Sequence, residues 1–318
     1  MPPSVNYETE HAQKNPKPDA SEKLSKRHRH LVFGYFESAF IIARSELRVL
    51  IFVWALVVSY LLASKLEPNY SILTLLAPAG YLLTLGVYVL SDIADVEDDR
   101  INSPDRPLAS GRVELRDAEI IAVTSISASL LIASAISTST LEVFVVLVLL
   151  GLSYSVPRAS VKRAFPLKAV VPSAGAAVIT LAGAIAAQGL SPVIFFVAIA
   201  FSLFALVTLL LGDIADLKGD FRTGVRSFPI VLGPKNSVRF VMVIPIIIGG
   251  LGVVFFRLIE LNIAFPVLLV CFCAYSSIAM SPLLSRYDDP VVCRKVKSRM
   301  RIAHFLMQLI FILGIISI

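Results

Sequence analysis

The chain has 318 residues, of which 56% are hydrophobic and 16% charged, and its mean hydropathy is +0.79. A soluble domain averages about 45–50% apolar residues even with glycine counted, so this composition, with uncharged runs such as Val143 to Leu150 and Ala198 to Leu211, predicts a polytopic membrane protein. It excludes a secreted disulfide scaffold, a coiled coil, a disordered regulator and an ordinary cytosolic enzyme.

The first segment of the chain is polar. Residues 1–30 contain Pro, Ser, Lys and Glu and lack the short apolar core of a secretory signal. We therefore expect a disordered cytoplasmic tail there, and a membrane-embedded domain over residues 31–318. Glu8, Glu10, Asp19 and Glu22 argue against a transit peptide, because such peptides are poor in acidic residues.

Nine predominantly apolar runs follow, as expected of helices that need about 20 residues to cross a bilayer. They lie at Val49 to Ala63, Ile72 to Leu90, Ile120 to Ile136, Val143 to Tyr154, Ala169 to Ala187, Val193 to Gly212, Phe240 to Phe256, Ile263 to Met280 and Ile302 to Ile318. The fourth is short for a span. The predicted fold class is all-α: a polytopic membrane bundle of about nine transmembrane helices.

The positions of Lys and Arg predict how this bundle is oriented. Of the 29 Lys and Arg residues, 27 lie in the N-terminal segment or in alternate connections, whereas Lys65 and Arg257 lie on the other side. Because cytoplasmic loops are enriched in basic residues, we expect a cytoplasmic N-terminus and an external C-terminus. The net charge of +6 is then mainly a topology signal, with a secondary role at anionic lipid or diphosphate, and no nucleic-acid partner is expected.

An acidic octapeptide occurs twice in the chain. Residues Asp92 to Asp99 read DIADVEDD and Asp213 to Asp220 read DIADLKGD, so five of eight positions are identical. Each follows an apolar run, and the four spans between them return the chain to the same face. Duplicated bundles with a site between corresponding halves recur among membrane proteins, so we expect the domain to consist of two Asp-motif halves.

Both octapeptides place carboxylates at i, i+3 and i+7, which lie on one face of a helix. The six acids are Asp92, Asp95 and Asp99 in the first strip and Asp213, Asp216 and Asp220 in the second. Two facing strips would repel one another unless cations lay between them. Carboxylate oxygens suit Mg²⁺, which commonly bridges to phosphate, so the strips predict a magnesium and diphosphate site on the cytoplasmic side.

Basic residues on the same predicted face complete this site. A diphosphate needs donors for its remaining oxygens, and Arg offers them in bidentate geometry. The candidate substrate-binding residues are Arg100, Arg106, Arg158, Lys162, Arg163 and Arg222. Metal and bases together would stabilise the charge that develops on a departing diphosphate, while a long hydrocarbon would lie among the apolar helices.

At these residues the sequence resembles the UbiA-type intramembrane prenyltransferase family. The segment SDIADVEDDR from Ser91 to Arg100 resembles the NDxxDxxxD motif of that family, and Asp213 to Asp220 is similar to its DxxDxxxD motif. The following segments, INSPDRPLASG to Gly111 and RTGVRSFPIVLG to Gly233, resemble the family too. The resemblance extends over nearly all the spans and omits about the first thirty residues.

The resemblance implies a helical bundle around a central cavity and two Mg²⁺ ions bound by the Asp motifs. It also implies transfer of an isoprenyl group from a prenyl diphosphate to a hydrophobic acceptor. By position, the catalytic metal-site residues are Asp95, Asp99, Asp216 and Asp220, with Asp92 and Asp213 supporting them.

Two positions depart from the family pattern. Ser91 replaces the usual Asn, and a hydroxyl is a shorter ligand than an amide oxygen. Tyr154 to Arg158 resembles a YxxxK element with Arg in place of Lys, which exchanges a point charge for a planar fork, and Lys162 is the alternative source of an ammonium.

Among other polar residues, His304 near the end of the last span is interpreted as packing or snorkelling, and Asp288 and Asp289 before Pro290 as a turn. The leading hypothesis is a Mg²⁺-dependent membrane prenyltransferase. Its segment DRINSPDRP resembles that of enzymes of archaeal ether-lipid synthesis, and this resemblance implies geranylgeranylglyceryl phosphate as the acceptor. An aromatic acceptor of quinone synthesis and an intramembrane terpene cyclase are the alternatives, and a cation transporter is the alternative from another class.

Overall fold

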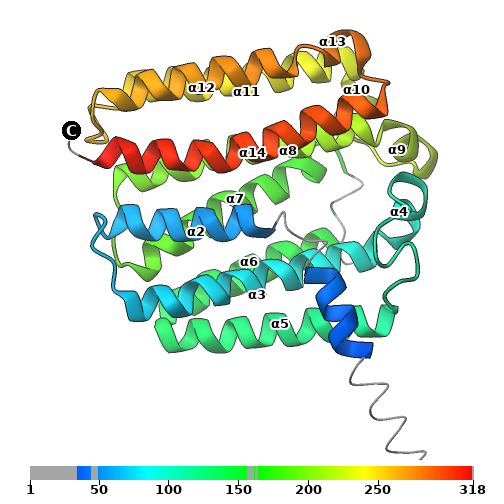
Figure 1. Cartoon of the computed structure of the whole chain (residues 1–318), viewed down its shortest axis with the longest axis horizontal. Coiled ribbons are helices and arrows are strands. Elements are labelled where there is room, and N and C mark those ends of the chain that lie inside the picture. Colours follow the sequence, from blue (N-terminus) through cyan, green and yellow to red (C-terminus); the bar gives the residue numbers. More distant parts are fainter. Residues whose placement is uncertain (1–33, 44–48, 156–160, 162–163, 317–318) are drawn as a thin grey trace, which may run out of the picture. The chain divides into compact units, whose positions relative to one another are not determined.

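The computed structural model describes residues 34–43, 49–155, 161 and 164–316, and within them every regular element is a helix (Figure 1). The predicted tail at residues 1–30 lies outside this range. The described residues divide into two units between Glu37 and Ser38, and the second unit contains all the long helices. A short apolar helix covers Gly34–Ala43.

In the described part of the chain, nine long helices correspond to the nine predicted apolar runs. They are α2 (Val49–Ala63), α3 (Tyr70–Ala94), α5 (Leu115–Ile136), α6 (Thr138–Ser155), α7 (Leu167–Ala186), α8 (Pro192–Ala215), α11 (Pro234–Phe255), α12 (Ala264–Met280) and α14 (Pro290–Ile315). All except the 15-residue α2 belong to the eight described stretches that are long and apolar enough to cross a membrane. The all-α membrane architecture is therefore confirmed.

The largest departure from the predicted boundaries is at α14. This helix begins at Pro290, twelve residues before the predicted run, and so includes five basic residues that the sequence assigned to a loop. Asp289 caps it, because its side chain accepts hydrogen bonds from the backbone N–H groups of Val291 and Val292. Hydropathy alone misses a helical start whose first turns are charged.

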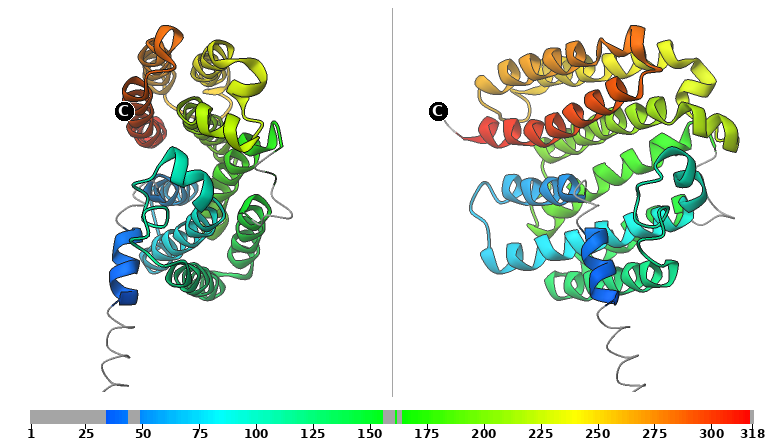
Figure 2. Two further views of the ribbon diagram at one scale, coloured as in Figure 1. Left: turned by 90° about the vertical axis from the view of Figure 1, so that its right-hand side faces the viewer. Right: turned by 45° about the vertical axis from the view of Figure 1, so that its right-hand side comes forward.

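Four short helices connect the long ones: α4 (Val96–Asn102), α9 (Leu217–Thr223), α10 (Phe228–Leu232) and α13 (Leu283–Arg286). Helices α4 and α9 pack against each other at one end of the bundle, to the right in Figure 1. The end-on view in Figure 2 shows the long helices arranged behind them. Each of these two short helices contains the last part of one acidic motif, so the fold brings the two octapeptides to the same end.

Small residues allow some helices to approach closely. A Cβ built on Gly183 of α7 would clash with the backbone oxygen of Leu56 in α2, so only glycine fits there. Such close backbone approach is typical of helices packed within membranes. Around α8, by contrast, the buried core includes large aromatic side chains such as Phe201, Phe204, Phe265 and Phe311.

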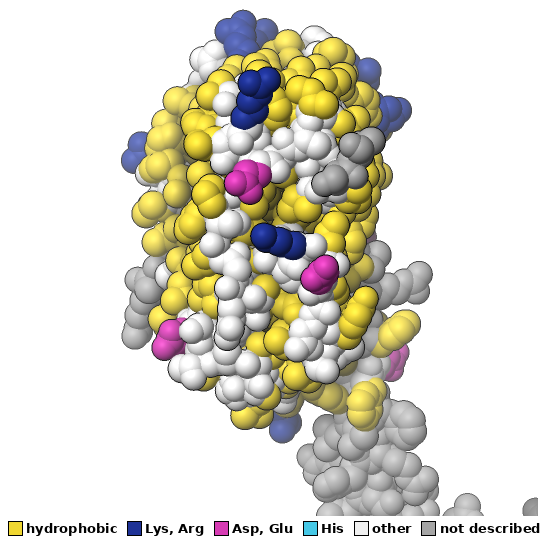
Figure 3. Space-filling model, turned by 90° about the vertical axis from the view of Figure 1, so that its left-hand side faces the viewer, with side chains coloured by type: hydrophobic (Ala, Val, Ile, Leu, Met, Phe, Trp, Pro, Cys, Tyr) yellow, Lys and Arg dark blue, Asp and Glu magenta, His cyan; other side chains and the backbone are white. Residues whose placement is uncertain are grey.

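The opposite end of the bundle has few charges. Figure 3 shows that end as a largely apolar and uncharged surface. The described connections there contain Lys65, Glu67, Arg257 and Glu260 as their charged residues. The charge asymmetry predicted along the sequence is therefore an asymmetry between the two ends of the folded bundle.

Candidate active site

Each acidic strip crosses a kink between a long helix and a short one. Asp95 ends α3 and begins α4, and Asp216 ends α8 and begins α9. Their backbone angles are nearly equal, with φ −99° and ψ 1° at Asp95 and φ −95° and ψ 8° at Asp216. The backbone N–H groups of Asp95 and Asp99 donate to Ser91 O and Asp95 O, and those of Asp216 and Asp220 donate to Gly212 O and Asp216 O. The i→i−4 bonding is therefore present on both sides of each kink.

One basic side chain bridges the outer acids of each strip. A guanidinium nitrogen (Nη1) of Arg106 lies 2.9 Å from Asp92 Oδ1 and 2.6 Å from Asp99 Oδ2. In the second strip, Lys168 Nζ lies 2.8 Å from Asp213 Oδ1 and 2.5 Å from Asp220 Oδ2. The two motifs therefore have the same local arrangement, although their bases come from different places in the chain.

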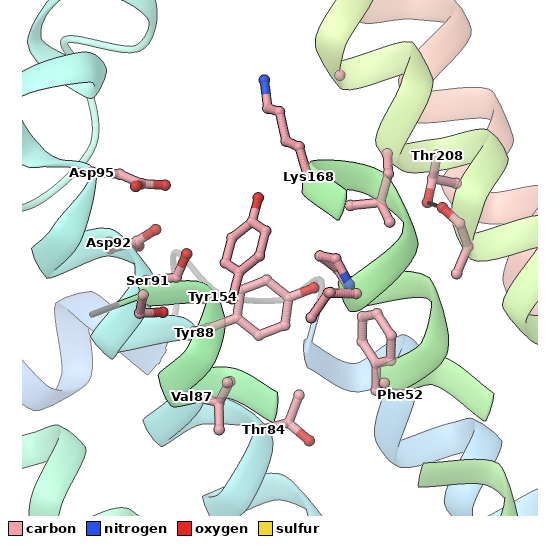
Figure 4. A pocket seen from close by; sticks show the side chains of 18 of the residues that line it. Phe52, Thr84, Val87, Tyr88, Ser91, Asp92, Asp95, Tyr154, Lys168 and Thr208 are labelled. Carbon is pink, nitrogen blue, oxygen red and sulfur yellow. Dashed lines mark hydrogen bonds between the residues drawn. The ribbon is translucent and has the colours of Figure 1, made fainter. Parts of the chain in front are cut away.

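The two strips share one cavity of about 340 Å³. Its polar end is lined by Asp92, Asp95, Asp98, Asp99, Ser103, Arg106, Lys168, Asp213, Asp216, Asp220 and Lys297. Its deeper wall is mostly apolar, with Leu83, Leu147 and Ile179 among the lining residues. Figure 4 shows Asp92 and Asp95 on one side, Lys168 and Thr208 on the other, and Tyr88 and Tyr154 between them.

Burial makes the acids of this end strong candidates for binding a cation. It raises the pKa of Asp99 to about 6, although the adjacent Arg106 guanidinium opposes the shift. It also raises the pKa of Asp216, against the attraction of Lys297. Carboxylates whose charge is poorly solvated gain most from a bound metal ion.

The carboxylate oxygens of the cavity are chemically suitable ligands for Mg²⁺, but they are not arranged as a metal site. Among the described residues, no group of three or more His, Cys, Asp or Glu side chains is close enough together to hold a metal ion. The outer acids bind Arg106 and Lys168 instead. However, the buried Asp213 Oδ2 has no hydrogen-bond partner within the described part of the chain, so an acceptor oxygen is available for a cation.

The six basic residues predicted to bind the substrate differ in their positions relative to the cavity. Arg106 lines the cavity, whereas the exposed Arg100 pairs with Glu97 at 2.9 Å and the exposed Arg222 lies outside the lining. Arg158, Lys162 and Arg163 lie outside the described residues. All six nominated aspartates line the cavity, and so do Ser91 and Tyr154.

Several lining residues were missed by sequence reasoning. Lys168 was counted as a loop charge, and no spacing relates it to Asp213 and Asp220, which follow 45 and 52 residues later. Lys297 and Arg301 were assigned to a loop because α14 begins earlier than its apolar run. His304, interpreted as packing or snorkelling, is buried and lines the cavity.

Comparison with known proteins agrees with these features. The model of the UbiA prenyltransferase family matches residues 51–307. A digeranylgeranylglyceryl phosphate synthase of Methanoculleus marisnigri is 32% identical over 185 residues, which cover 58% of this chain and 64%, just under two thirds, of that relative. The synthase of the same name from Methanocaldococcus jannaschii is 25% identical over 269 residues, covering 82% of this chain and 90% of that relative.

Solved structures show the same fold. One, reported for a digeranylgeranylglyceryl phosphate synthase in membranes, has a TM-score of 0.69 at 23% identity and covers 89% of this chain and 99% of that one. A UbiA homolog from Archaeoglobus fulgidus, bound to GPP and Mg²⁺, has a TM-score of 0.66 at 14% identity, covering 86% and 99%. The fold is thus shared along almost the whole length of both proteins.

Proposed function

The chain belongs to the UbiA prenyltransferase family, and from that premise we propose that it transfers a prenyl group from a prenyl diphosphate to the hydroxyl of a prenylated glyceryl phosphate. The acceptor class comes from the two relatives named as digeranylgeranylglyceryl phosphate synthases. In the reaction the bond from prenyl C1 to the diphosphate oxygen breaks, a C–O bond to the acceptor forms, and the hydroxyl proton is released.

The observation that supports this proposal best is the pair of matching aspartate strips around one cavity. The strips and their bridging bases make one end of the cavity suitable for a diphosphate, and the apolar wall makes the rest suitable for a hydrocarbon. A cation transporter needs no such apolar extension, and its site usually lies near the bilayer midplane. An enzyme acting on an amphiphile with an anionic head fits the cavity better.

Mg²⁺ is the cofactor we propose, held by Asp95, Asp99, Asp216 and Asp220 with Asp92 and Asp213 in support. When bound, it would neutralise charge on the diphosphate and favour its departure. Arg106 and Lys168 each hold a pair of acids in place and have further N–H groups to donate to phosphate oxygens. The apolar wall orients the prenyl chain and excludes water from its C1.

We further propose that the end of the bundle with α4 and α9 faces the cytoplasm. Most of the described Lys and Arg residues lie in the connections and the adjoining helix ends there, as is typical of the cytoplasmic side of a membrane protein. An anionic headgroup would then meet the site from the cytoplasmic leaflet.

Incubation of the purified full chain with radiolabelled geranylgeranyl diphosphate, Mg²⁺ and a panel of acceptors tests the proposal. We expect a labelled adduct with geranylgeranylglyceryl phosphate that requires Mg²⁺ and is lost in the double variant Asp95→Ala, Asp216→Ala. An adduct formed only with aromatic acceptors would assign a different acceptor class. A cyclised hydrocarbon without an adduct would indicate a terpene cyclase, and folded protein without turnover at any chain length would contradict the proposal.

A further inference from the structure

Helix α14 presents three ionisable side chains to the cavity. Lys297, Arg301 and His304 are at i, i+4 and i+7, all line the cavity, and all lie within a stretch long and apolar enough to cross a membrane. Ionisable residues in such helices are costly and usually mark a functional path or site. This face of α14 takes no part in the bridges that Arg106 and Lys168 make to the aspartates.

Lys297 lies at the polar end of this face. Its Nζ would be only 3.1 Å from a Cβ placed on Gly212, the residue before Asp213. The ammonium is thus level with the second acidic strip but comes from another helix than Lys168. Arg301 follows one turn deeper on α14 and also lines the cavity.

His304 lies deeper and has an unused nitrogen. Its side chain is 3% exposed and its ring is 6.2 Å from that of Phe201 and 5.2 Å from that of Phe204. One ring nitrogen bonds the backbone oxygen of Phe201, whereas Nε2 is buried without a partner in the described structure. Because Nδ1 donates this hydrogen bond, it carries the hydrogen of the neutral ring, and Nε2 is an acceptor. A group that pairs with Nε2 must therefore be a hydrogen-bond donor such as a hydroxyl.

The spacing between these groups matches a small phosphorylated alcohol. Phe204 beside His304 and Gly212 beside Lys297 are eight residues apart on α8, or about 12 Å along the helix. That distance accommodates a phosphate, a three-carbon backbone and a hydrogen bond at each end. We propose that Lys297 and Arg301 bind the phosphate of the acceptor and that His304 Nε2 accepts a hydrogen bond from its nucleophilic hydroxyl.

This inference rests on the proposed function, because it assigns the acceptor head to α14 and leaves the diphosphate between the aspartate strips. The acceptor would then lie alongside the prenyl diphosphate, with its phosphate near the level of Asp213 and its hydroxyl deeper, next to the prenyl C1. The site thereby selects an acceptor that is both phosphorylated and hydroxylated.

Equilibrium binding of geranylgeranylglyceryl phosphate to the full chain tests the phosphate site without requiring turnover. Lys297→Gln and Arg301→Gln should each weaken binding about tenfold, whereas their affinity for geranylgeranyl diphosphate with Mg²⁺ should change less than about twofold. Arg299→Gln, an exposed base of α14 outside the cavity lining, is the matched control and should bind as wild type.

Two results would overturn the phosphate site. One is an equal loss of affinity for the prenyl diphosphate, which would assign Lys297 and Arg301 to the diphosphate instead. The other is wild-type affinity for the acceptor in both variants. Wild-type protein that binds the acceptor through these residues but does not transfer the prenyl group would refute the proposed function while leaving the site in place.

The hydroxyl contact is tested with a deoxy acceptor that has hydrogen in place of the hydroxyl. Wild type should prefer the hydroxylated acceptor by about tenfold, the value of one hydrogen bond to a buried group. His304→Leu should lose that preference, and His304→Gln, which retains a donor and an acceptor, should keep part of it. If the His304→Leu variant has wild-type thermal stability and still prefers the hydroxylated acceptor, the contact with His304 is excluded.

Discussion

Arg106 and Arg100 are two arginines of the first motif region that the structure places differently. Arg106 bridges Asp92 and Asp99 in the cavity, whereas the side chain of Arg100 is 57% exposed and pairs with Glu97. A preorganised cation at a departing anion is worth about 100-fold or more in rate, but an exposed ion pair contributes little. Arg106→Gln should therefore lower kcat/KM for the prenyl diphosphate about 100-fold, and Arg100→Gln should change it less than about twofold.

Steady-state kinetics with the two purified variants checks this prediction, with thermal unfolding as the control for folding. Equal losses in the two variants would mean that the motif region acts through its overall charge rather than through the bridge from Arg106.

The sequence predicts the six aspartates of the site but not Lys168. The aspartates repeat at helical spacing in two similar octapeptides, so their face follows from local geometry. Lys168 reaches Asp213 and Asp220 only because α7 packs against α8. Its position depends on tertiary packing, which leaves no signal in the spacing of residues along the chain.

Among the helices, the similar kinks of α3–α4 and α8–α9 predict that substitutions at the two kinks lower activity to a similar extent. Asp95 and Asp216 occupy the two kinks with almost the same backbone angles, and both line the cavity. Asp95→Asn and Asp216→Asn should each lower kcat about 100-fold or more, because each removes a charge that faces the diphosphate and its metal. Glu97→Gln in α4, an exposed position outside the cavity lining, should retain activity.

Activity titrated against Mg²⁺ concentration distinguishes the two sides of the site in this experiment. A large loss in one aspartate variant with normal activity in the other would show that the kinks, although alike in backbone, have unequal roles.

The contact between α2 and α7 gives a prediction about stability. In Gly183→Ala the added Cβ would meet the backbone oxygen of Leu56, which cannot turn away as a side chain does, so the helices must separate. Overpacking of this kind costs about 1–3 kcal/mol. In Gly250→Ala nothing lies within 4 Å of the added Cβ, so this matched variant in α11 should be at least as stable as wild type.

Thermal unfolding in detergent measures both glycine variants. If Gly183→Ala unfolds at or above the wild-type temperature, α2 can move away at this contact without a loss of stability, which would contradict the prediction.

The start of α14 shows why hydropathy predicts the apolar part of a helix but not its charged first turns. Nine apolar runs predicted nine long helices, because burial in lipid requires apolar side chains. The first three turns of α14 contain Arg294, Lys295 and Arg299 on an exposed side and begin at the capped Pro290. A helix that extends beyond the hydrocarbon needs no apolar turns there, so its start follows from capping rather than from hydropathy.

At the scale of the whole molecule, charge and chemistry coincide at one end of the bundle. The basic connections that indicate orientation lie at the same end as the two acidic strips and their cavity. One end therefore combines the features of a cytoplasmic surface with those of a site for anionic headgroups. The opposite end contains few charges in its described connections.

This asymmetry predicts the orientation of the protein in cells. Asp105, in the connection after α4, and Glu67, in the connection after α2, are exposed at opposite ends. In a background with its three native cysteines replaced by serine, a membrane-impermeant maleimide should label Glu67→Cys in intact cells. It should label Asp105→Cys only after permeabilisation, because connections rich in Lys and Arg stay in the cytoplasm. Labelling of Asp105→Cys in intact cells, with Glu67→Cys protected, would reverse the orientation and place the cavity mouth on the external side.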